Sequence, residues 1–593
     1  MTPIYAWATL PEFAEIQSFL TEHNHPKHLI FCLQNTDFPH FTQPENSTAE
    51  QTQLHTALTE STRCLTFDAV NYIANWQPQT HLWFMPVAAA SALHEHFTQP
   101  ENSTAEQTQL HTALTESTRC LTFDAVNYIA NWQPQTHLWF MPVAAASALH
   151  EHFTQPENII WQTQAIPQNT PKSQKSWQTQ PENPHTQPEN IHAVIIGAGI
   201  AGAATAHELA IHGAKVTVLE RSERVAQAGS GNQQGLLYAK ISPHNTEQTE
   251  LLLTGYGYTR RILKTLFPNQ ENWGATGILH LNHNESETQR NQKLAQKTHY
   301  RHLYRPVTPE EASQIAGIPI AQSGLYWQQG AWLNPPAIVN ALLQHPNITV
   351  HTQTQVHTAT HNDAHWQIQT NQGDYTATHL IICTGADNQT TPIIRDYPFQ
   401  MIRGQTSVAT ATEGSLKLKT ALSGASYISP AWHNQHCFGA TFINNDPSSE
   451  WRGEDDTANQ QELAQLNPFL ASELHTQPEN INHGSLKGHT AVRCDSHDHL
   501  PVVGALSDVA AMRSVYAKLA LDKNYRLTAP CPYLPNAYTN TAHGSRGLAT
   551  APICAAEIAA QICGTPHPLS ERLRQALNPN RLIIRQIVRH EVQ

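Results

Sequence analysis

The segment from His192 to Glu220 most constrains what this chain can fold into, because it has the order of a strand, a glycine turn, a helix and a second strand. A short apolar run leads directly into Gly197-x-Gly199-x-x-Gly202. The first glycine permits a tight turn, the second lets the backbone approach a pyrophosphate, and the third lets helix and strand pack closely. The segment therefore predicts the first unit of a parallel α/β sheet that binds a dinucleotide.

Two further features of this segment fit a nucleotide. The N-terminus of the helix offers unpaired N–H groups and the positive end of the helix dipole to a phosphate. Glu220 closes the second strand, about 20 residues after the glycines, and is expected to accept hydrogen bonds from ribose hydroxyls. A Gly-x-Gly-x-x-Gly pattern alone is often only a glycine-rich turn, but the complete order of strand, glycines, helix, strand and acid is specific.

Two later stretches contain residues suited to the same ligand. The run Ala228–His244 holds Ser230, Gly231 and Asn232, whose backbone and side-chain donors suit a diphosphate or the edge of a flavin; the alternative is a simple Gly/Ser loop. The apolar strand His379–Gly385 ends on a glycine that is expected to pass close to the cofactor.

The second half of the chain predicts a substrate layer and another helix N-terminus. Residues 402–485 contain short, alternating apolar runs, which favour an antiparallel substrate layer inserted into the nucleotide domain. Thr541–Ile562 is a glycine turn that runs into a long apolar helix, so Gly544, Ser545 and Gly547 are expected at a helix N-terminus that receives an anion or flavin carbonyl oxygens.

Composition limits the class of protein. A net charge of −13 argues against a broadly basic nucleic-acid binder, although 37 histidines leave room for a local basic patch. Nine cysteines without a Cys-x-x-Cys pair indicate reduced thiols in a cytoplasm. No apolar run reaches the length of a membrane span, and the N-terminus lacks a basic segment followed by an apolar one. We therefore expect a soluble cytoplasmic protein.

Residues 1–190 differ from the rest of the chain. They contain no glycine, and within them a 56-residue unit is written twice without a change, as residues 40–95 and 96–151. Perfect identity indicates a recent duplication of a gene segment, and two units are too few for a solenoid.

Each unit contains elements of a small α/β layer. Leu82–Val87 is a strand-like apolar run, Ala49–Thr59 and Ala88–His94 are helix-like, and His28–Leu33 upstream is a further candidate strand. Whether both copies join one core is left open, because the second copy of the strand must find its own place in the sheet.

The pentapeptide TQPEN has a proline and no apolar residue, which predicts loops or linkers. Pro167–Asn190, which holds two copies, is therefore expected to link the N-terminal region to the nucleotide domain. The copy in the catalytic region is expected to be an exposed loop. The six copies begin at Thr42, Thr98, Thr154, Thr179, Thr186 and Thr476.

The motifs of residues 191–593 occur in the order of a known family. They are GAGIAG, GSGNQQG, the Gly324–Pro335 segment, ICTGA, VRCDSHDHLPVVG, GSRGLATAPICAAEIAAQI and ALNPNRLIIRQIV. Together they resemble the FAD-dependent oxidoreductase domain of the MnmC family of tRNA-modifying proteins, and more broadly the glycine oxidase and D-amino acid oxidase group.

The resemblance implies a fold, a cofactor and a reaction. The fold would be an FAD-binding Rossmann-type parallel sheet with an inserted antiparallel substrate domain. The substrate would be a tRNA wobble uridine with a carboxymethylaminomethyl arm, which is oxidised with FAD and then hydrolysed to the aminomethyl nucleoside and glyoxylate, with oxygen as the final acceptor. The residues that would hold FAD are Gly197, Gly199, Gly202, Glu220, Ser230, Gly231, Asn232, Val356, Gly385, Gly544, Gly547 and Leu548.

This reaction requires an anchor for the substrate carboxylate, and arginine supplies a planar, always charged, two-pronged donor. Arg493 and Arg546 are the candidates, because each lies in a stretch that resembles one with a carboxylate-binding arginine in glycine oxidases. The alternative for each is an ordinary ion pair. No metal is expected: the group Asp495, His497, Asp498 and His499 reads as a hydrogen-bonded turn.

The resemblance also predicts domain boundaries. The accessory region would cover residues 1–166 and the linker 167–190. Within 191–593, FAD-binding parts would cover about 191–275, 335–390 and 490–593, and substrate parts about 276–334 and 391–489.

Two-domain members of the family also carry a methyltransferase that uses S-adenosylmethionine. Such a site needs a glycine-rich loop, and residues 1–190 have none, so we expect the methylation step to be missing from this chain. For tRNA binding, a C-terminal group of arginines could meet phosphates, or could instead form a solvated helix face. These are Arg572, Arg574, Arg581, Arg585 and Arg589.

Two other functions stay open. The chain could oxidise free glycine or an N-substituted glycine, although the C-terminal segment favours tRNA. It could also be an inactive tRNA-binding protein with a flavin fold. The sequence does not predict the oligomeric state.

Overall fold

A computed structural model describes the second part of the chain almost completely. Before residue 176 it describes six strands. From there it describes Ser176–Gln178, residue 181 and residues 188–591, without residues 245, 297–302, 363, 475–487, 565–567 and 570. The chain divides into two compact units, residues 1–174 with 565–573 and residues 175–564 with 574–593.

The glycine motif lies in a six-stranded sheet in the order β15-β8-β7-β19-β28-β27. Five strands are parallel, and β27 runs antiparallel at one edge. The predicted parallel α/β fold is therefore confirmed. The strands are β7 His192–Ile196, β8 Lys215–Leu219, β15 Ile348–His351, β19 His379–Ile382, β27 Val502–Ser507 and β28 Tyr533–Thr541.

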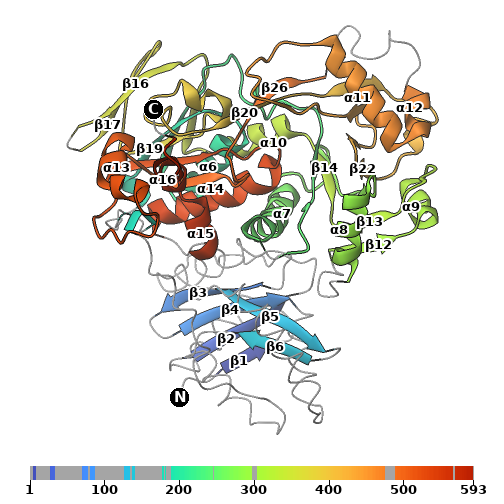
Figure 1. Ribbon diagram of the computed structural model, residues 1–593, viewed down its shortest axis with the longest axis horizontal. Helices are drawn as coiled ribbons and strands as arrows, with labels where there is room; N and C mark the ends of the chain where they lie inside the picture. Colours follow the sequence, from blue (N-terminus) through green and yellow to red (C-terminus); the bar gives the residue numbers. More distant parts are fainter. Residues whose placement is uncertain are drawn as a thin grey trace. The chain divides into compact units, whose positions relative to one another are not determined.

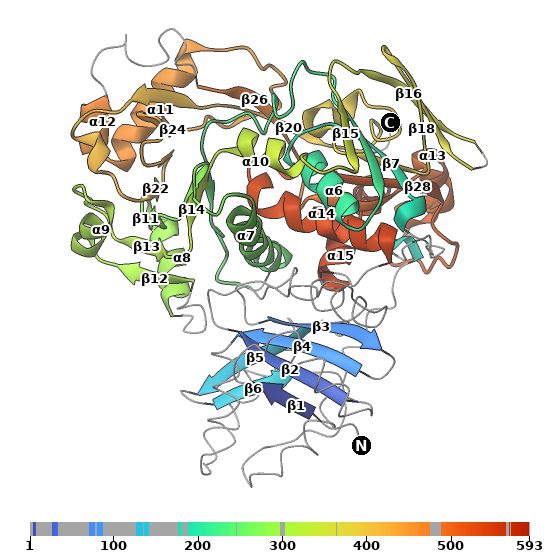
Figure 2. The same cartoon turned by 180° about the vertical axis from the view of Figure 1, so that it is seen from behind.

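Both faces of this sheet are covered, as expected for strands that are apolar throughout. On one face lie α6 (Ile200–Ile211) and α14 (Gly547–Cys563), with α7 (Glu247–Leu266) against α14 (Figures 1 and 2). On the other face, Val194 and Ile196 join a core with residues of the small sheet β16-β17-β18 and the C-terminal helices. These elements are β16 Val356–His361, β17 Trp366–Thr370, β18 Gly373–Ala377, α13 Val509–Val515 and α16 Asn580–Val588.

A seven-stranded sheet is built from the parts expected to form the substrate layer. Its order is β12-β13-β11-β22-β23-β24-β21. Neighbouring strands are antiparallel except β11 and β22, which are parallel, so the layer is mixed rather than purely antiparallel. The strands are β11 Ile278–Leu281, β12 Tyr304–Val307, β13 Gly324–Trp327, β21 Ser407–Thr410, β22 Ala421–Ser423, β23 Tyr427–Ile428 and β24 Gln435–Phe438.

This unit also contains two three-stranded sheets, and one of them connects a predicted FAD-binding part with a predicted substrate part. In this sheet β26, which carries Arg493, pairs with β20, which lies in the predicted substrate part 391–489. These sheets consist of β9 Gly235–Leu237, β10 Trp273–Gly274 and β14 Ala331–Leu333, and of β20 Gln400–Gln405, β25 Ile443–Asn444 and β26 Thr490–Asp495. The other helices are α8 Glu285–Ala295, α9 Pro309–Ala316, α10 Pro335–Leu342, α11 Gly453–Leu466, α12 Pro468–Leu474 and α15 Glu571–Leu577.

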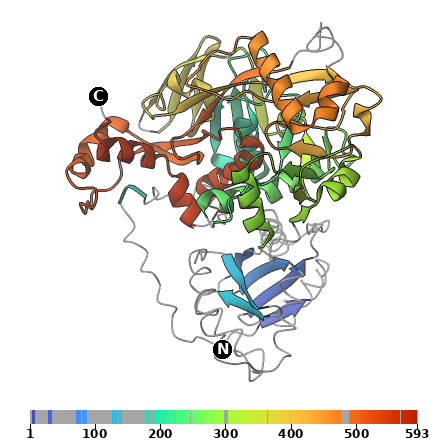
Figure 3. The same cartoon turned by 45° about the vertical axis from the view of Figure 1, so that its right-hand side comes forward.

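The first unit contains one sheet, in the order β1-β2-β4-β3-β5-β6 (Figure 3, blue to cyan). The candidate strand His28–Leu33 lies in β2, and the apolar run from Leu82 lies in β4. Both copies of the duplicated unit contribute a hairpin, and the second pairs with the first through β3 and β5. The strands are β1 Ile4–Trp7, β2 Lys27–Leu33, β3 Val70–Gln77, β4 Thr80–Pro86, β5 Val126–Gln133 and β6 Thr136–Phe140.

Part of the segment expected to be a linker is integrated into the second unit. Trp177, in the short helix Ser176–Gln178, is buried in the core behind the nucleotide sheet. Its carbonyl oxygen accepts a hydrogen bond from Asn580 Nδ2 at 3.1 Å, and the neighbouring Ser176 hydroxyl donates to Leu527 O at 3.0 Å.

Several expectations fall outside the described residues. These are the two helix-like runs of the duplicated unit and the TQPEN copies that begin at Thr42, Thr98, Thr154 and Thr476. Of the helices that are described, none is long and apolar enough to cross a membrane.

Candidate active site

The carboxyl ends of the central parallel strands open into one cavity. The chain leaves β7 at Gly197, β8 at Glu220 and β19 at Cys383, and all three residues line the cavity of about 630 Å³. This is where open α/β sheets bind their ligands. The cavity lining includes the predicted residues Gly197, Gly199, Glu220, Ser230, Asn232, Val356, Gly385, Arg493, Gly544, Arg546, Gly547 and Leu548.

The glycine turn has the geometry that the pattern predicts. Gly197 has a φ of +102°, and a Cβ there would lie 2.6 Å from Cys383 O. A Cβ on Gly202 would lie 1.9 Å from Gly197 O, so helix α6 can start this close to the turn only with glycine at this position. Gly202 does not line the cavity, and its contribution is this close packing.

Glu220 and Ser230 hold the loops around the start of α6. Glu220 Oε2 accepts a hydrogen bond from Ala198 N at 2.8 Å, and Oε1 accepts one from Ser222 N, also at 2.8 Å. A carboxylate has about four acceptor positions, so the expected contact with ribose hydroxyls is still possible. Ser230 Oγ accepts from Ile200 N at 2.9 Å and therefore lies at the helix N-terminus, where a phosphate would bind.

Two residues of the Gly/Ser segment, Gly231 and Asn232, make other contacts than those expected of donors to the cofactor. Gly231 does not line the cavity; a Cβ there would lie 2.4 Å from the ring of His489, so the glycine makes room for this histidine. Asn232 donates to Tyr427 Oη at 3.0 Å and to Gln234 O at 2.7 Å, and so orients the substrate side of the cavity. His489 and Tyr427, which both line the cavity, were not predicted.

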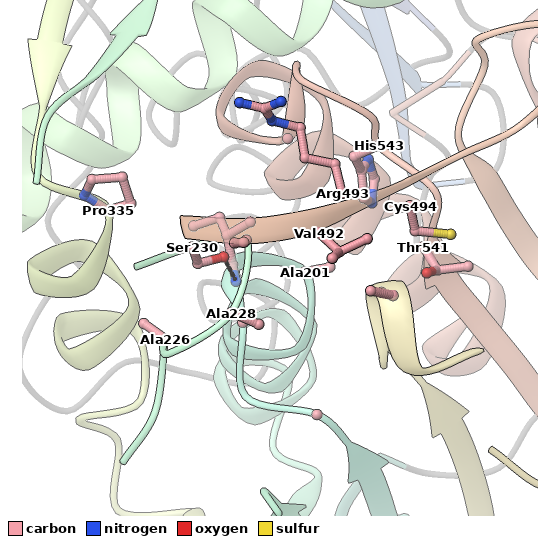
Figure 4. A pocket seen from close by; sticks show the side chains of 18 of the residues that line it. Ala201, Ala226, Ala228, Ser230, Pro335, Val492, Arg493, Cys494, Thr541 and His543 are labelled. Carbon is pink, nitrogen blue, oxygen red and sulfur yellow. Dashed lines mark hydrogen bonds between the residues drawn. The ribbon is translucent and has the colours of Figure 1, made fainter. Parts of the chain in front are cut away.

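Arg493 is a buried guanidinium group that lines the cavity. Its Nη1 donates to Thr441 O at 3.3 Å, and no carboxylate forms an ion pair with it in the described part of the chain. Burial lowers its pKa, and the nearby Tyr427 acts in the opposite direction. Figure 4 shows the side chain extended from β26, away from the neighbouring Val492. A buried cation without an anion is costly, which favours an anionic ligand over the ion-pair alternative.

Arg546, the second candidate, precedes α14 and also lines the cavity. Its Nη1 is buried and has no hydrogen-bond partner in the part of the chain that the structure describes. Different groups surround the two arginines: Arg493 is next to Gly404 and Thr441 O, whereas Arg546 is near Tyr238, Asp495 and Arg290. The cavity thus brings both candidates together, but in different surroundings.

Tyr238 and Lys240 also line the cavity beside Arg546 and were not predicted. Both lie in the run Ala228–His244, two residues apart and just after β9. Alternation along an extended chain places such residues on one side, so the spacing was a usable signal.

The remaining polar candidates have structural partners. Asp495 accepts from His499 Nδ1 at 2.8 Å, and Asp498 forms a two-pronged ion pair with Arg581 at 2.9 and 3.0 Å. These contacts form a hydrogen-bonded turn. Among the described residues, no group of three or more His, Cys, Asp or Glu side chains could hold a metal ion.

Comparisons with known proteins agree with this geometry. A family model for FAD dependent oxidoreductases matches residues 192–561. The chain is 37% identical over 423 residues to the tRNA 5-methylaminomethyl-2-thiouridine biosynthesis bifunctional protein MnmC of Chromobacterium violaceum, and 37% identical over 408 residues to that of Pseudomonas entomophila. These alignments cover 71% and 68% of this chain but only 63% and 62% of the relatives, so the chain spans less than two thirds of their length.

Solved structures support the fold. L-proline dehydrogenase of P. horikoshii aligns with a TM-score of 0.51 and 16% identity, and the alignment covers 66% of this chain and 98% of that protein. Glycine oxidase of Geobacillus kaustophilus aligns with a TM-score of 0.50 and 16% identity, covering 64% and 96%. At this identity the likeness concerns the fold alone. Fold, cavity and family model lead to one conclusion: the chain belongs to the FAD dependent oxidoreductase family and is an enzyme with FAD as its cofactor.

Proposed function

We propose that this enzyme oxidises the carboxymethylaminomethyl arm of the wobble uridine in tRNA. We also propose that it acts in the cytoplasm. The arm is a secondary amine with a glycine unit. Its oxidation to the imine and the addition of water release glyoxylate and leave the 5-aminomethyl nucleoside. Two observations support this proposal: the relatives are named for tRNA 5-methylaminomethyl-2-thiouridine biosynthesis, and Arg493 is a buried guanidinium group in the cavity that has no ion-pair partner among the described residues.

The residues of the cavity fit FAD. The Gly197 turn, the N-terminus of α6 and Glu220 suit the dinucleotide part, and the N-terminus of α14 at Gly547 suits an electron-rich edge of the flavin ring. FAD supplies the acceptor for the two electrons of the oxidation, and we expect oxygen to take them on from it. The protein has to hold the substrate in place and keep its amine uncharged.

Arg493 is proposed to bind the substrate carboxylate with both prongs of its guanidinium group. Tyr427 lies next to it; burial raises the pKa of this phenol well above its ordinary value, so it stays protonated and can donate a hydrogen bond. His543 lines the same cavity between Asn540 Oδ1 and Thr550 Oγ1, both at 3.0 Å. Burial lowers the pKa of His543 to about 3, so it adds no positive charge near the amine.

The test is nucleoside analysis of tRNA before and after incubation with the FAD-loaded protein. We expect the carboxymethylaminomethyl nucleoside to decrease, and the aminomethyl nucleoside and glyoxylate to appear in equal amounts. Under anaerobic conditions the substrate should bleach the flavin absorbance, and air should restore it. Persistence of the original nucleoside despite bound flavin would rule out the proposal. Faster turnover of free glycine or an N-substituted glycine would instead identify a small-molecule oxidase.

We further propose that residues 1–190 do not methylate the product. They contain no glycine, whereas a methyl-donor site needs a glycine-rich loop for close backbone approach. With S-adenosylmethionine present, the aminomethyl nucleoside should therefore accumulate without conversion to the methylaminomethyl form. Conversion by the pure protein would contradict this expectation.

A further inference from the structure

The cavity contains more positive charge than a glycine-like substrate needs. A carboxymethylaminomethyl amine has one anionic group, and Arg493 is sufficient to bind it. A second group of cations lies on the other elements of the cavity wall. We name Lys240, Arg290 and Arg546 the cationic cluster; Lys240 and Arg546 line the cavity, and Arg290 lies on α8.

The positive charge of this cluster is only partly balanced. Glu287 forms ion pairs with Lys240, at 3.4 Å, and with Arg290. Arg546 forms no ion pair in the described part of the chain, and its buried Nη1 has no hydrogen-bond partner. Asp495 acts on Arg546 from a distance, but its oxygens accept hydrogen bonds from His499 and from Ser496 N. Glu287 is thus the direct partner of two of the three cations, and Arg546 has no carboxylate partner among the described residues.

Neutral side chains complete the site. Tyr238 Oη lies 2.8 Å from Ser423 Oγ and 3.3 Å from His280 Nδ1, and Tyr238 and Ser423 both line the cavity. Burial lowers the pKa of His280 to about 4, so His280 is neutral and adds no charge. Cations surrounded by hydroxyl groups are typical of sites for phosphate oxygens.

The cluster and Arg493 occupy different parts of the cavity. Arg493 lies on β26, where its guanidinium group is next to Gly404 and Thr441 O, whereas Lys240 follows β9 and Arg290 lies on α8. A ligand with a single carboxylate would therefore contact only one of these two cationic sites. A nucleotide with a carboxylate-bearing arm has two anionic groups, one at each end.

We propose, on the basis of the proposed function, that the cationic cluster binds the phosphate that adjoins the modified nucleoside while Arg493 binds the carboxylate of its arm. The substrate is then recognised at two ends, and the C–H bond to be oxidised lies between them. The enzyme would accordingly prefer a nucleotide to the nucleoside with the same arm.

The experiment compares three substrates with FAD-loaded protein: 5-carboxymethylaminomethyluridine, its 5′-monophosphate and its 3′-monophosphate. For the wild type we expect kcat/KM for one monophosphate to exceed that for the nucleoside about ten- to a hundredfold, as for a charge-assisted contact of about 1.5–3 kcal/mol. Lys240→Met should bring this ratio close to one, and Glu287→Gln should raise it. Lys293→Met is the matched control: Lys293 is an exposed lysine on the same helix α8 and should leave the ratio unchanged.

A binding measurement tests the phosphate site without turnover. Calorimetric titration of the oxidised protein with uridine monophosphates and with uridine should show tighter binding of one monophosphate, and Lys240→Met should abolish the difference. If the wild type binds and converts nucleoside and nucleotide equally, this inference is wrong although the proposed function stands.

If Lys240→Met weakens both substrates equally, or changes the flavin spectrum, the cluster serves the carboxylate or the flavin, and the inference is also wrong. If no arm-bearing substrate is converted, the proposed function fails. The binding difference for the monophosphate then still confirms or refutes the phosphate site.

Discussion

Replacing Arg493 with methionine tests the carboxylate anchor most directly. Among the described residues, the guanidinium group makes one hydrogen bond, to Thr441 O at 3.3 Å, so its loss should cost the fold only about 0.5–1.5 kcal/mol. Loss of a buried charge contact to the substrate should cost about 2–5 kcal/mol of binding, or roughly 30- to 5000-fold in kcat/KM. The assay is glyoxylate release from arm-bearing tRNA, with flavin absorbance and melting temperature measured on the same sample.

The R493M protein should therefore stay yellow and folded while its kcat/KM falls. Arg493→Lys should restore part of the activity, because lysine keeps the charge but not the two-pronged geometry. Gly404→Ala perturbs the same group from a second side, since a Cβ there would lie 2.3 Å from Arg493 Nη1. Unchanged kcat/KM in R493M, or loss of flavin, would refute the reasoning and make the residue structural.

Three further predictions concern the fold. Gly202→Ala should cost at least about 1–3 kcal/mol and reduce FAD retention, because its Cβ would lie 1.9 Å from Gly197 O; normal stability and full flavin content would contradict the close packing. Trp177→Ala should destabilise the protein by about 3–5 kcal/mol in denaturant unfolding, whereas a side chain in a free linker would have no effect. Burial lowers the pKa of His280 and His379 to about 4 and of His543 to about 3. As the pH falls below 6.5, these histidines therefore become protonated in the unfolded chain before they do in the folded protein. The stability they contribute is complete above pH 6.5 and decreases by up to about 1.4 kcal/mol per pH unit and group towards pH 4. Melting curves should show this decrease, and His543→Asn should make it less steep.

The nucleotide half of the molecule was predictable because its signals are local. The glycine turn, the strand before it and Glu220 lie within 29 consecutive residues, and each has a backbone or packing reason for its identity. The strand that ends near Gly385 was predictable because its three consecutive aliphatic residues, Leu380 to Ile382, suit a sheet buried on both faces.

The substrate half was less predictable because its residues meet only through tertiary structure. Tyr427 reaches the cavity from β23, a strand of two residues that carries no recognisable pattern. His489 fills the space that Gly231 leaves free, over 250 positions away in the chain, and no periodicity connects the two. Likewise, the parallel pair β11 and β22 lies inside an otherwise antiparallel layer, and short alternating runs do not reveal the direction of pairing.

The duplicated region was only partly predictable from its sequence. Leu82–Val87 was recognisable as a strand, but its hairpin partner Val70–Gln77 mixes polar and apolar residues and was not predicted. The second copy of the strand finds its place in the sheet because its hairpin repeats the first and adds to the edge at β3. Identical sequences thus form identical hairpins, and an open sheet edge accepts both.

If the proposed function holds, the salt dependence of binding should show how the chain binds tRNA. Of the C-terminal arginines that were candidates for phosphate contacts, Arg581 forms an ion pair with Asp498 at 2.9 Å and Arg585 forms one with Glu591 at 2.8 Å. The cations that the proposal assigns to the substrate are Arg493 and the cationic cluster. Each phosphate contact in a single-stranded region contributes about −0.7 to the slope of log K against log salt concentration.

For one phosphate in the cationic cluster we therefore expect a slope of about −0.7 for an anticodon stem-loop, and a slope near zero in Lys240→Met. A slope of −4 or steeper in the wild type would mean that further surface cations contact the RNA, and that recognition is not confined to the modified nucleotide.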